Sequence, residues 1–317
     1  MSRTKLVCLF AMALFVCKTS SVFAVAGIGI HYGFDMTLKM NNKLMEQTTF
    51  DNLNLNMTGI TGSLPTGFTN ATTITGAQLP IFINRTNFEN TGINFGGKLF
   101  VDVIPVIDAI EVSTNFGVWQ YRGVIKYPNS IEFKSSQPTD PNAPFIDRVN
   151  VVYDSTELTL KNFNLSYFGL TNTPYAKLQI DATIRKYFLQ IPPVVKIVKF
   201  YGGAGFTLDF ATPVLSAKLI QDALGSTLNK TLSYNEINSQ IFSQDEIMKK
   251  VMQKILDGLM TPHYGCNLDL GAMVKIPVVP LGFYLDAKYI ILFDKLDKYV
   301  DVGGNGLLIN IGAALVF

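Results

Sequence analysis

Histidine, the side chain that most often transfers protons near neutral pH, occurs only twice in the chain, as His31 and His263. His31 and Asp35 fall in a segment that alternates polar and apolar residues, so both side chains are expected on one face of a strand. At a rise of about 3.3 Å per residue they lie roughly 13 Å apart, too far for a hydrogen-bonded dyad. His263 is distant in sequence, and no metal-ligand spacing surrounds either histidine. The sequence therefore predicts no enzyme, no cofactor and no metal site.

Charged side chains of both signs recur on the polar faces of the alternating segments. The inward set comprises Asp35, Lys39, Lys98, Asp102, Glu111, Lys177, Asp181, Arg185, Lys199, Asp209, Asp269, Lys275, Asp286 and Lys288. Charges enclosed in a protein must pair or remain hydrated. Two interpretations follow: a structural network of salt bridges that holds a barrel closed, or a narrow conduit for small solutes. We favour the structural network, because the side chains of an eight-stranded barrel just fill its interior.

Eight alternating segments must position these charges. They cover residues 27–41, 93–103, 110–119, 176–185, 198–210, 264–275, 283–293 and 306–317. Tilted strands of about 9 to 11 residues cross a bilayer, whereas strands in soluble sandwiches usually have about 5 or 6. The chain is 48% hydrophobic and only 16% charged. We therefore predict an all-β fold, a transmembrane up-and-down antiparallel barrel with an apolar outer surface.

The connections between these segments differ in length at the two ends of the expected barrel. Ile104-Pro105, Ile191-Pro192 and Ile276-Pro277 each end a strand and lead within a few residues into the next one. Long connections cover residues 42–90, 126–174 and 212–262, with a short one near 294–304. Short turns at one rim and long loops at the other are typical of outer-membrane barrels, with the loops outside.

Two of the long loops contain signals for further structure. In 212–262, Ser243 and Glu246 have the spacing of a capping box, and Gly258 is a suitable helix stop. Val214–Leu224 is a second expected helix, and both helices are expected to cover the outer mouth. In 126–174, the segment Glu157–Phe168 has strand character and is interpreted as a strand extension or hairpin above the membrane.

Two further expectations concern the number of strands and the structure of the first loop. A ten-stranded barrel, with an additional strand near Val149–Asp154, is the alternative to eight strands. The first loop, 42–90, is rich in Thr, Asn and Gly and is expected to be irregular or short-stranded.

The first 24 residues have the features of a secretory signal peptide. Arg3 and Lys5 precede an apolar run from Leu6 to Val16, and small residues before Val25 suit cleavage. Residues 25–317 then form a single barrel domain. Cleavage also removes Lys18, which leaves 23 of the 26 basic residues against 24 acidic ones, a net charge of about −1. Such a balance gives no reason to expect nucleic-acid binding.

The chain ends in an alternating strand whose last residue is aromatic, although soluble termini are usually polar and frayed. The spacing of Gly312, Leu315 and Phe317 resembles the C-terminal recognition signal of bacterial outer-membrane β-barrel proteins. The resemblance implies location in the bacterial outer membrane. It also implies contact with outer-membrane lipid and with the export and barrel-assembly machinery.

The sequence favours a structural or surface-binding role through the extracellular loops, with an extracellular ligand that it does not identify. The alternative is a narrow channel or transporter for small or amphiphilic solutes.

Overall fold

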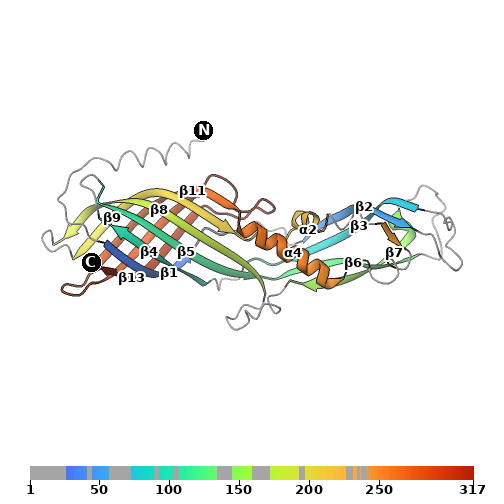
Figure 1. Cartoon of the computed structure of the whole chain (residues 1–317), viewed down its shortest axis with the longest axis horizontal. Coiled ribbons are helices and arrows are strands. Elements are labelled where there is room, and N and C mark those ends of the chain that lie inside the picture. Colours follow the sequence, from blue (N-terminus) through green and yellow to red (C-terminus); the bar gives the residue numbers. More distant parts are fainter. Residues whose placement is uncertain are drawn as a thin grey trace.

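The computed structural model describes residues 26–40, 45–56, 73–88, 93–102, 107–133, 145–158, 172–192, 197–225, 231–233, 236, 241 and 243–317. The expected signal peptide, residues 1–24, lies outside the described residues. The backbone forms a closed barrel and a separate five-stranded sheet. Figure 1 shows an elongated molecule with the barrel at one end, the second sheet at the other, and two helices between them.

The barrel is built from eight antiparallel strands in an up-and-down order. They are β1 (Ala26–Asp35), β4 (Ile93–Val101), β5 (Ala109–Tyr121), β8 (Thr173–Ile191), β9 (Val198–Ala211), β11 (Pro262–Lys275), β12 (Leu281–Leu292) and β13 (Gly306–Val316). β1 pairs with both β4 and β13, which closes the barrel. Every expected strand is present in the barrel, so the predicted fold class is confirmed. The ten-stranded alternative is wrong, because Val149–Asp154 belongs to the second sheet.

Alternation along the strands divides the barrel into an apolar outer face and a polar interior. β1 alternates exposed and buried side chains over nearly its whole length. Its outward residues are apolar, and Ile30 is 74% exposed. On β12, which is separated from β1 only by β13, Phe283 is 52% exposed and also points outward. Because successive side chains of a strand point to opposite faces, the period of two in the sequence produces both surfaces at once.

The short turns gather at the end of the barrel that carries the C-terminus (Figure 1). Ile191 is the last residue of β8 and is followed by Pro192, and Ile276-Pro277 follows β11 directly. The third expected turn, Ile104-Pro105, lies outside the described residues. At the opposite end the chain continues into the second sheet and the helices.

The second sheet collects strands from all three long connections in the order β10-β2-β3-β6-β7. These are β2 (Met45–Asn56), β3 (Thr73–Arg85), β6 (Gly123–Phe133), β7 (Val149–Glu157) after the short helix η1 (Phe145–Arg148), and β10 (Thr231–Ser233). The expectation that loop 42–90 is irregular or short-stranded is wrong, because β2 and β3 have 12 and 13 residues. Glu157 ends β7, and residues 159–168 of the expected hairpin lie outside the described residues.

The barrel and the second sheet are joined by continuous chain. Only Arg122 separates β5 from β6. Its backbone is held at the end of β3, because the Thr86 N–H donates to the Arg122 carbonyl and the Arg122 N–H donates to Thr86 Oγ1, both at 2.9 Å. The Arg122 guanidinium also pairs with Glu157 at 3.0 Å. The two sheets therefore meet at a tightly bonded junction.

Both expected helices are present. α2 (Ala217–Leu224) begins after Ser216, and α4 (Gln244–Leu259) begins after Ser243, whose side chain accepts from the Glu246 N–H at 3.1 Å. Gly258 does not stop α4, which continues to Leu259. A Cβ at Gly258 would collide with the ring of Pro213, so glycine permits the last turn of α4 to pack on the chain after β9. Neither helix is long and apolar enough to cross a membrane, nor is any other among the described residues.

One hydrophobic core connects the second sheet to the end of the barrel next to the helices, which is called the outer mouth after the expected orientation. It comprises Leu79, Ile81 and Ile83 of β3, Trp119 and Tyr121 of β5, Tyr175 of β8, Leu219 and Ile220 of α2, Ile247, Val251 and Ile255 of α4, and Leu292, Leu296 and Val300 near β12. At its centre the fully buried Tyr121 hydroxyl accepts a 2.8 Å hydrogen bond from the Leu215 N–H, which holds the approach to α2 against the barrel mouth.

Replacing Tyr121 with Phe should lower the free energy of unfolding by about 1–3 kcal/mol, because the buried Leu215 N–H loses its acceptor. Urea titration of the folded protein, followed by the fluorescence of the single tryptophan, Trp119, measures this change. Tyr264→Phe is the control, since Tyr264 is exposed on the outer barrel wall and should shift stability by less than about 0.5 kcal/mol. Equal effects of the two substitutions would show that the Leu215 contact does not stabilise the mouth.

Candidate functional site: the barrel interior and its outer mouth

The middle of the barrel interior contains a network of buried ion pairs centred on Arg185. Its guanidinium pairs with Glu111, with Asp269 at 2.6 Å and with Asp286 at 3.4 Å. Two lysines complete the network. Lys98 lies 2.8 Å from Asp286 and 3.4 Å from Glu111, and Lys288 lies 3.1 Å from Asp181 and 3.3 Å from Glu111. All these side chains are at most 2% exposed, so each charge depends on its partners.

A second group lies closer to the outer mouth. Lys177 pairs with Asp35 at 3.1 Å and with Asp209 at 3.4 Å. The Lys177 ammonium also donates to Thr37 Oγ1 at 3.0 Å, and the Thr37 hydroxyl donates in turn to Asp35 at 2.5 Å. The fully buried Tyr175 belongs to the hydrophobic core next to this group. These ion pairs therefore lie directly against the hydrophobic core that fills the barrel mouth.

The opposite end of the interior is filled mainly by apolar and aromatic side chains. Phe100, Tyr201, Met273, Tyr284, Ala314 and Val316 form this inner cluster. Beside it Lys199 pairs with Asp102 at 3.1 Å, and the Tyr187 hydroxyl donates to Asp102 at 2.8 Å. The interior thus consists of an inner apolar cluster, a central ionic layer and an outer ionic group below the core.

The structure brings together most of the charges expected inside the barrel. Of the expected set, Lys39 and Lys275 belong neither to the central network nor to the groups around Lys177 and Lys199. Lys39 is exposed, because β1 ends at Asp35 and the chain has left the wall. Lys275 is the last residue of β11 and lies half-buried at the rim.

The two histidines are separated by the fold and have different surroundings. His31 points inward and is buried, with Nδ1 2.9 Å from the Tyr284 hydroxyl and Nε2 2.9 Å from Asn115 Oδ1. Asp35, which also faces inward, bonds instead to Lys177 and Thr37. His263 lies at the outer end of β11. Within the described residues no cluster of His, Cys, Asp or Glu could hold a metal ion.

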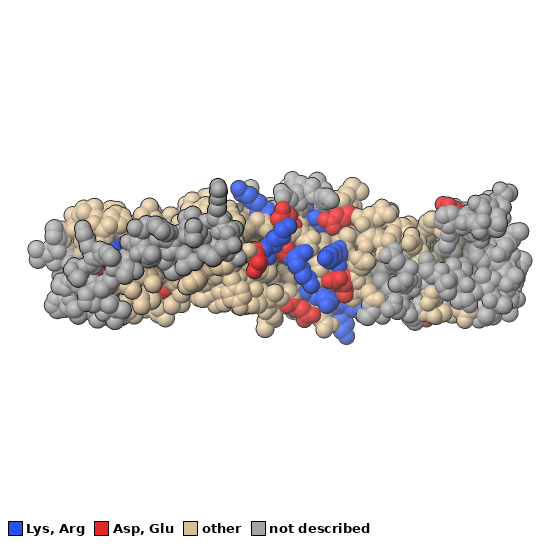
Figure 2. Space-filling model, turned by 90° about the horizontal axis from the view of Figure 1, so that it is seen from above, with Lys and Arg blue, Asp and Glu red and all other residues tan. Residues whose placement is uncertain are grey.

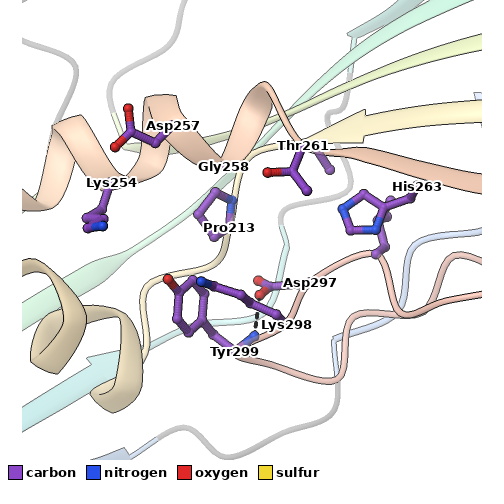
Figure 3. A pocket seen from close by; sticks show the side chains of 11 residues that line it. Pro213, Lys254, Asp257, Gly258, Thr261, His263, Asp297, Lys298 and Tyr299 are labelled. Atoms are coloured by element: carbon purple, nitrogen blue, oxygen red, sulfur yellow. Dashed lines mark hydrogen bonds between the residues drawn. The ribbon is translucent and has the colours of Figure 1, made fainter.

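His263 lines a cavity at the outer mouth that the sequence did not predict. The cavity has a volume of about 230 Å³ and is lined by Ala211, Pro213, Lys254, Asp257, Gly258, Thr261, His263, Leu296, Asp297, Lys298 and Tyr299. Figure 3 shows that these residues come from the end of β9 and the chain after it, the end of α4, the start of β11 and the loop after β12. Residues from four separate segments are therefore collected at one place, and three of these segments contribute polar side chains.

Asp297 forms the fixed part of this cavity. It is only 3% exposed and accepts hydrogen bonds from the backbone N–H groups of Val214 at 2.6 Å, Tyr299 at 2.7 Å and Val300 at 3.4 Å. Burial raises the pKa of the Asp297 carboxyl, although these bonds oppose the shift. The carboxylate thus links the loop after β12 to the chain leading into α2. It was missed because its role depends on backbone groups that are distant in sequence.

A belt of charged side chains extends from the cavity along α2 and α4. Figure 2 shows Lys, Arg, Asp and Glu gathered across the middle of one face of the molecule, whereas the barrel part of that face is mainly uncharged where it is described. This charged belt includes Lys218 and Asp222 of α2, Asp245, Glu246, Lys249, Lys250, Lys254 and Asp257 of α4, and Lys298 of the loop after β12. The belt lies where the apolar barrel wall ends.

The residues of the expected assembly signal lie on β13 and at the chain end. Gly312 sits beside Tyr284 and opposite His31, where a Cβ would collide with the Tyr284 ring. Leu315 points outward, and Phe317 is 67% exposed. The Phe317 N–H donates to the Ala26 carbonyl at 2.8 Å, so the last residue also joins the two ends of the barrel chain.

The fold defines the class of protein as a closed eight-stranded antiparallel β-barrel, compatible with an outer-membrane barrel. No protein-family model matches the chain, and no curated protein is similar to it in sequence.

Replacing Arg185 with Ala should lower the free energy of unfolding by about 3–5 kcal/mol, because Glu111 and Asp269 lose a buried partner. Lys275→Ala removes a positive charge from the rim and should change stability by less than about 0.5 kcal/mol. Urea unfolding of both variants, read by Trp119 fluorescence, makes the comparison. A loss for Arg185→Ala no larger than for Lys275→Ala would mean that the network does not hold the barrel together.

Proposed function

We propose that the chain is an integral protein of a bacterial outer membrane, in which the barrel anchors the second sheet outside the cell for a structural or surface-binding role. The observation that carries this proposal is the continuous hydrophobic core, which closes the barrel mouth and joins it to the second sheet. A barrel closed in this way supports the sheet instead of opening a passage beneath it. The proposal assigns no enzymatic activity.

The outer wall of the barrel supports the membrane placement. Large apolar side chains such as Ile30, Phe95 and Leu285 are about half exposed or more, although such groups are normally buried in soluble proteins. They belong to β1, β4 and β12, and on β9, across the barrel from β1, Phe206 is 61% exposed as well. Outward apolar residues with an inward polar set are expected of a barrel in lipid. The charged belt then lies at the level of the headgroups, and the second sheet lies beyond it.

The filled interior favours a closed barrel over the narrow conduit. A conduit needs water along its length, yet Arg185, Lys98 and Lys288 are buried against carboxylates in the middle of the interior. The inner apolar cluster and the outer hydrophobic core lie at the two ends of this ionic layer. Opening a path would require separating several buried ion pairs together, which is costly in a low-dielectric interior.

The second sheet offers a surface that suits binding. On the face opposite to its core, Phe82 of β3 and Tyr153 of β7 form an edge-to-face aromatic pair with centroids 5.7 Å apart. The ammonium of Lys126, on β6 between them, lies 5.3 Å from the Tyr153 ring centroid. Aromatic rings beside a cation are common at recognition surfaces, so this is where we expect an extracellular ligand or partner.

The membrane proposal predicts where the protein is recovered. Expressed in a Gram-negative host, it should fractionate with the outer membrane, require detergent for extraction and show heat-modifiable mobility on a gel. Phe317→Ala should lower the amount of folded protein, since it changes the residue that would signal assembly. Phe283→Ala, which removes another outward aromatic ring, should change that amount less. Recovery of the wild type as a soluble periplasmic protein would refute the proposal.

The closed-barrel proposal predicts no ionic conductance in planar bilayers. The complete protein should give no reproducible unitary currents. A variant lacking residues 214–260 should also stay closed, because the central ion pairs remain after both helices are removed. Currents in the complete protein would favour the conduit. Currents only in the deletion variant would show that the helices, and not the ionic layer, close the interior.

A further inference from the structure

The cavity at the barrel mouth is held open by rigid contacts. The last turn of α4 rests on Pro213 at Gly258, and the opposite side is the loop that Asp297 ties to the backbone of Val214. α2 and α4 also pack on each other. Because these supports do not use the lysines of the cavity, Lys254 and Lys298 are left to contact a ligand.

The charged side chains of the cavity differ in how many contacts they already make within the protein. The Asp297 carboxylate is buried and accepts from backbone N–H groups. Asp257 is exposed, and Figure 3 shows its carboxylate turned away from Pro213 and Asp297. Neither carboxylate forms an ion pair with Lys254 or Lys298 within the described part of the chain, although the charge of Asp297 acts on Lys298 at longer range.

Among the described residues Lys254 forms no ion pair, although Asp257 stands three residues further along α4 and also lines the cavity. Lys250 pairs with Glu246 at 3.2 Å in the i, i+4 arrangement, but four residues after Lys254 stands Gly258. The glycine that permits the contact with Pro213 thus also leaves Lys254 without a helical partner at that position.

Lys298 makes only surface contacts, one of them a hydrogen bond with the Tyr299 side chain. Its ammonium is 3.8 Å from Asp222 and 4.5 Å from the centroid of the Tyr299 ring, and its side chain is 70% exposed. An exposed ion pair of this length contributes little. Moreover, Asp222 already accepts a 3.0 Å hydrogen bond from the Tyr299 hydroxyl. Lys298 can therefore turn to an anion in the cavity at little cost.

Hydroxyl and imidazole groups complete the lining. Thr261 and His263 lie on the side of the cavity away from Lys254 (Figure 3). A phosphate group has oxygens in several directions, so it accepts from lysine ammonium groups and a hydroxyl together. A volume of about 230 Å³ accommodates a phosphate with the first atoms of the group that carries it.

We propose that this cavity binds the phosphate of a lipid headgroup, with Lys254 and Lys298 as its cationic contacts and Thr261 as a hydroxyl donor. The choice of a lipid rests on the proposed membrane placement, because the cavity lies in the charged belt next to the apolar wall. A headgroup there could reach the cavity while its acyl chains stay against the barrel.

The test uses the full-length protein in detergent, with native mass spectrometry as the readout. The probes are dihexanoyl phosphatidic acid, the matching dihexanoyl glycerol without phosphate, and inorganic phosphate. The wild type should retain phosphatidic acid and not the glycerol. The double variant Lys254→Ala/Lys298→Ala should bind phosphatidic acid about tenfold or more weakly, since it loses two charge-assisted contacts.

The matched control is Lys218→Ala/Lys249→Ala. It removes the same charge from exposed positions of α2 and α4 in the charged belt, outside the cavity lining, and should retain wild-type binding. Heat-modifiable mobility establishes that each variant is folded.

The remaining outcomes each decide the proposal. Equal losses in both double variants would overturn it in favour of non-specific attraction to the belt. Binding of inorganic phosphate as tightly as phosphatidic acid would overturn the lipid assignment. Because the assay uses detergent, cavity binding by a protein that fractionates as soluble would refute the membrane proposal alone. Failure of the wild type to bind phosphatidic acid, although it reaches the outer membrane, would refute the cavity proposal alone.

Discussion

The ion pairs of Arg185 are the interaction on which the rest of the structure depends. A guanidinium enclosed in a barrel cannot keep its water, so its carboxylate partners must be supplied by the surrounding strands. Glu111 comes from β5, Asp269 from β11 and Asp286 from β12, so the network is complete only when the barrel is closed. The strand order therefore determines which charges meet, and the need to pair these buried charges favours that strand order.

Space for this arrangement comes from glycine on a neighbouring strand. A Cβ at Gly203 would lie 2.7 Å from the Ile184 carbonyl and 3.1 Å from the stem of Arg185. Gly203 faces Arg185 across the β8–β9 pair, so its missing side chain lets the large guanidinium stem fit against the wall. An interior filled in this manner cannot also be a wide passage, which moves any specific function to the outer end of the molecule.

The sequence predicted the barrel well because its signals are local. A period of two identifies each strand without knowledge of its partner, and capping residues such as Ser243 act within one turn of a helix. The second sheet was not predicted, because its strands pair between different loops, as β3 does with β6. The alternation of buried Leu79, Ile81 and Ile83 was present in the sequence but lay among Thr, Asn and Gly.

The interior charges show the same division between local and non-local information. Alternation identified Lys98 and Arg185 as inward, but it did not identify which carboxylate each one meets. It also continued to Lys39, where the backbone is no longer a strand, because a pattern of residue types does not mark where pairing ends. The cavity was missed for a related reason, since its lining comes from four segments that only the closed fold brings together.

The junction at Arg122 has a mechanical consequence. β6 of the second sheet continues into β5 of the barrel through this one residue, whose backbone is bonded to Thr86. A pull on the outer sheet along the long axis would pass straight into β5. The hydrogen bonds that join β5 to β4 and β8 run across the strand, so they would carry the load side by side in shear instead of opening one after another. The fold therefore transmits tension from the second sheet to the barrel along the long axis and resists extension.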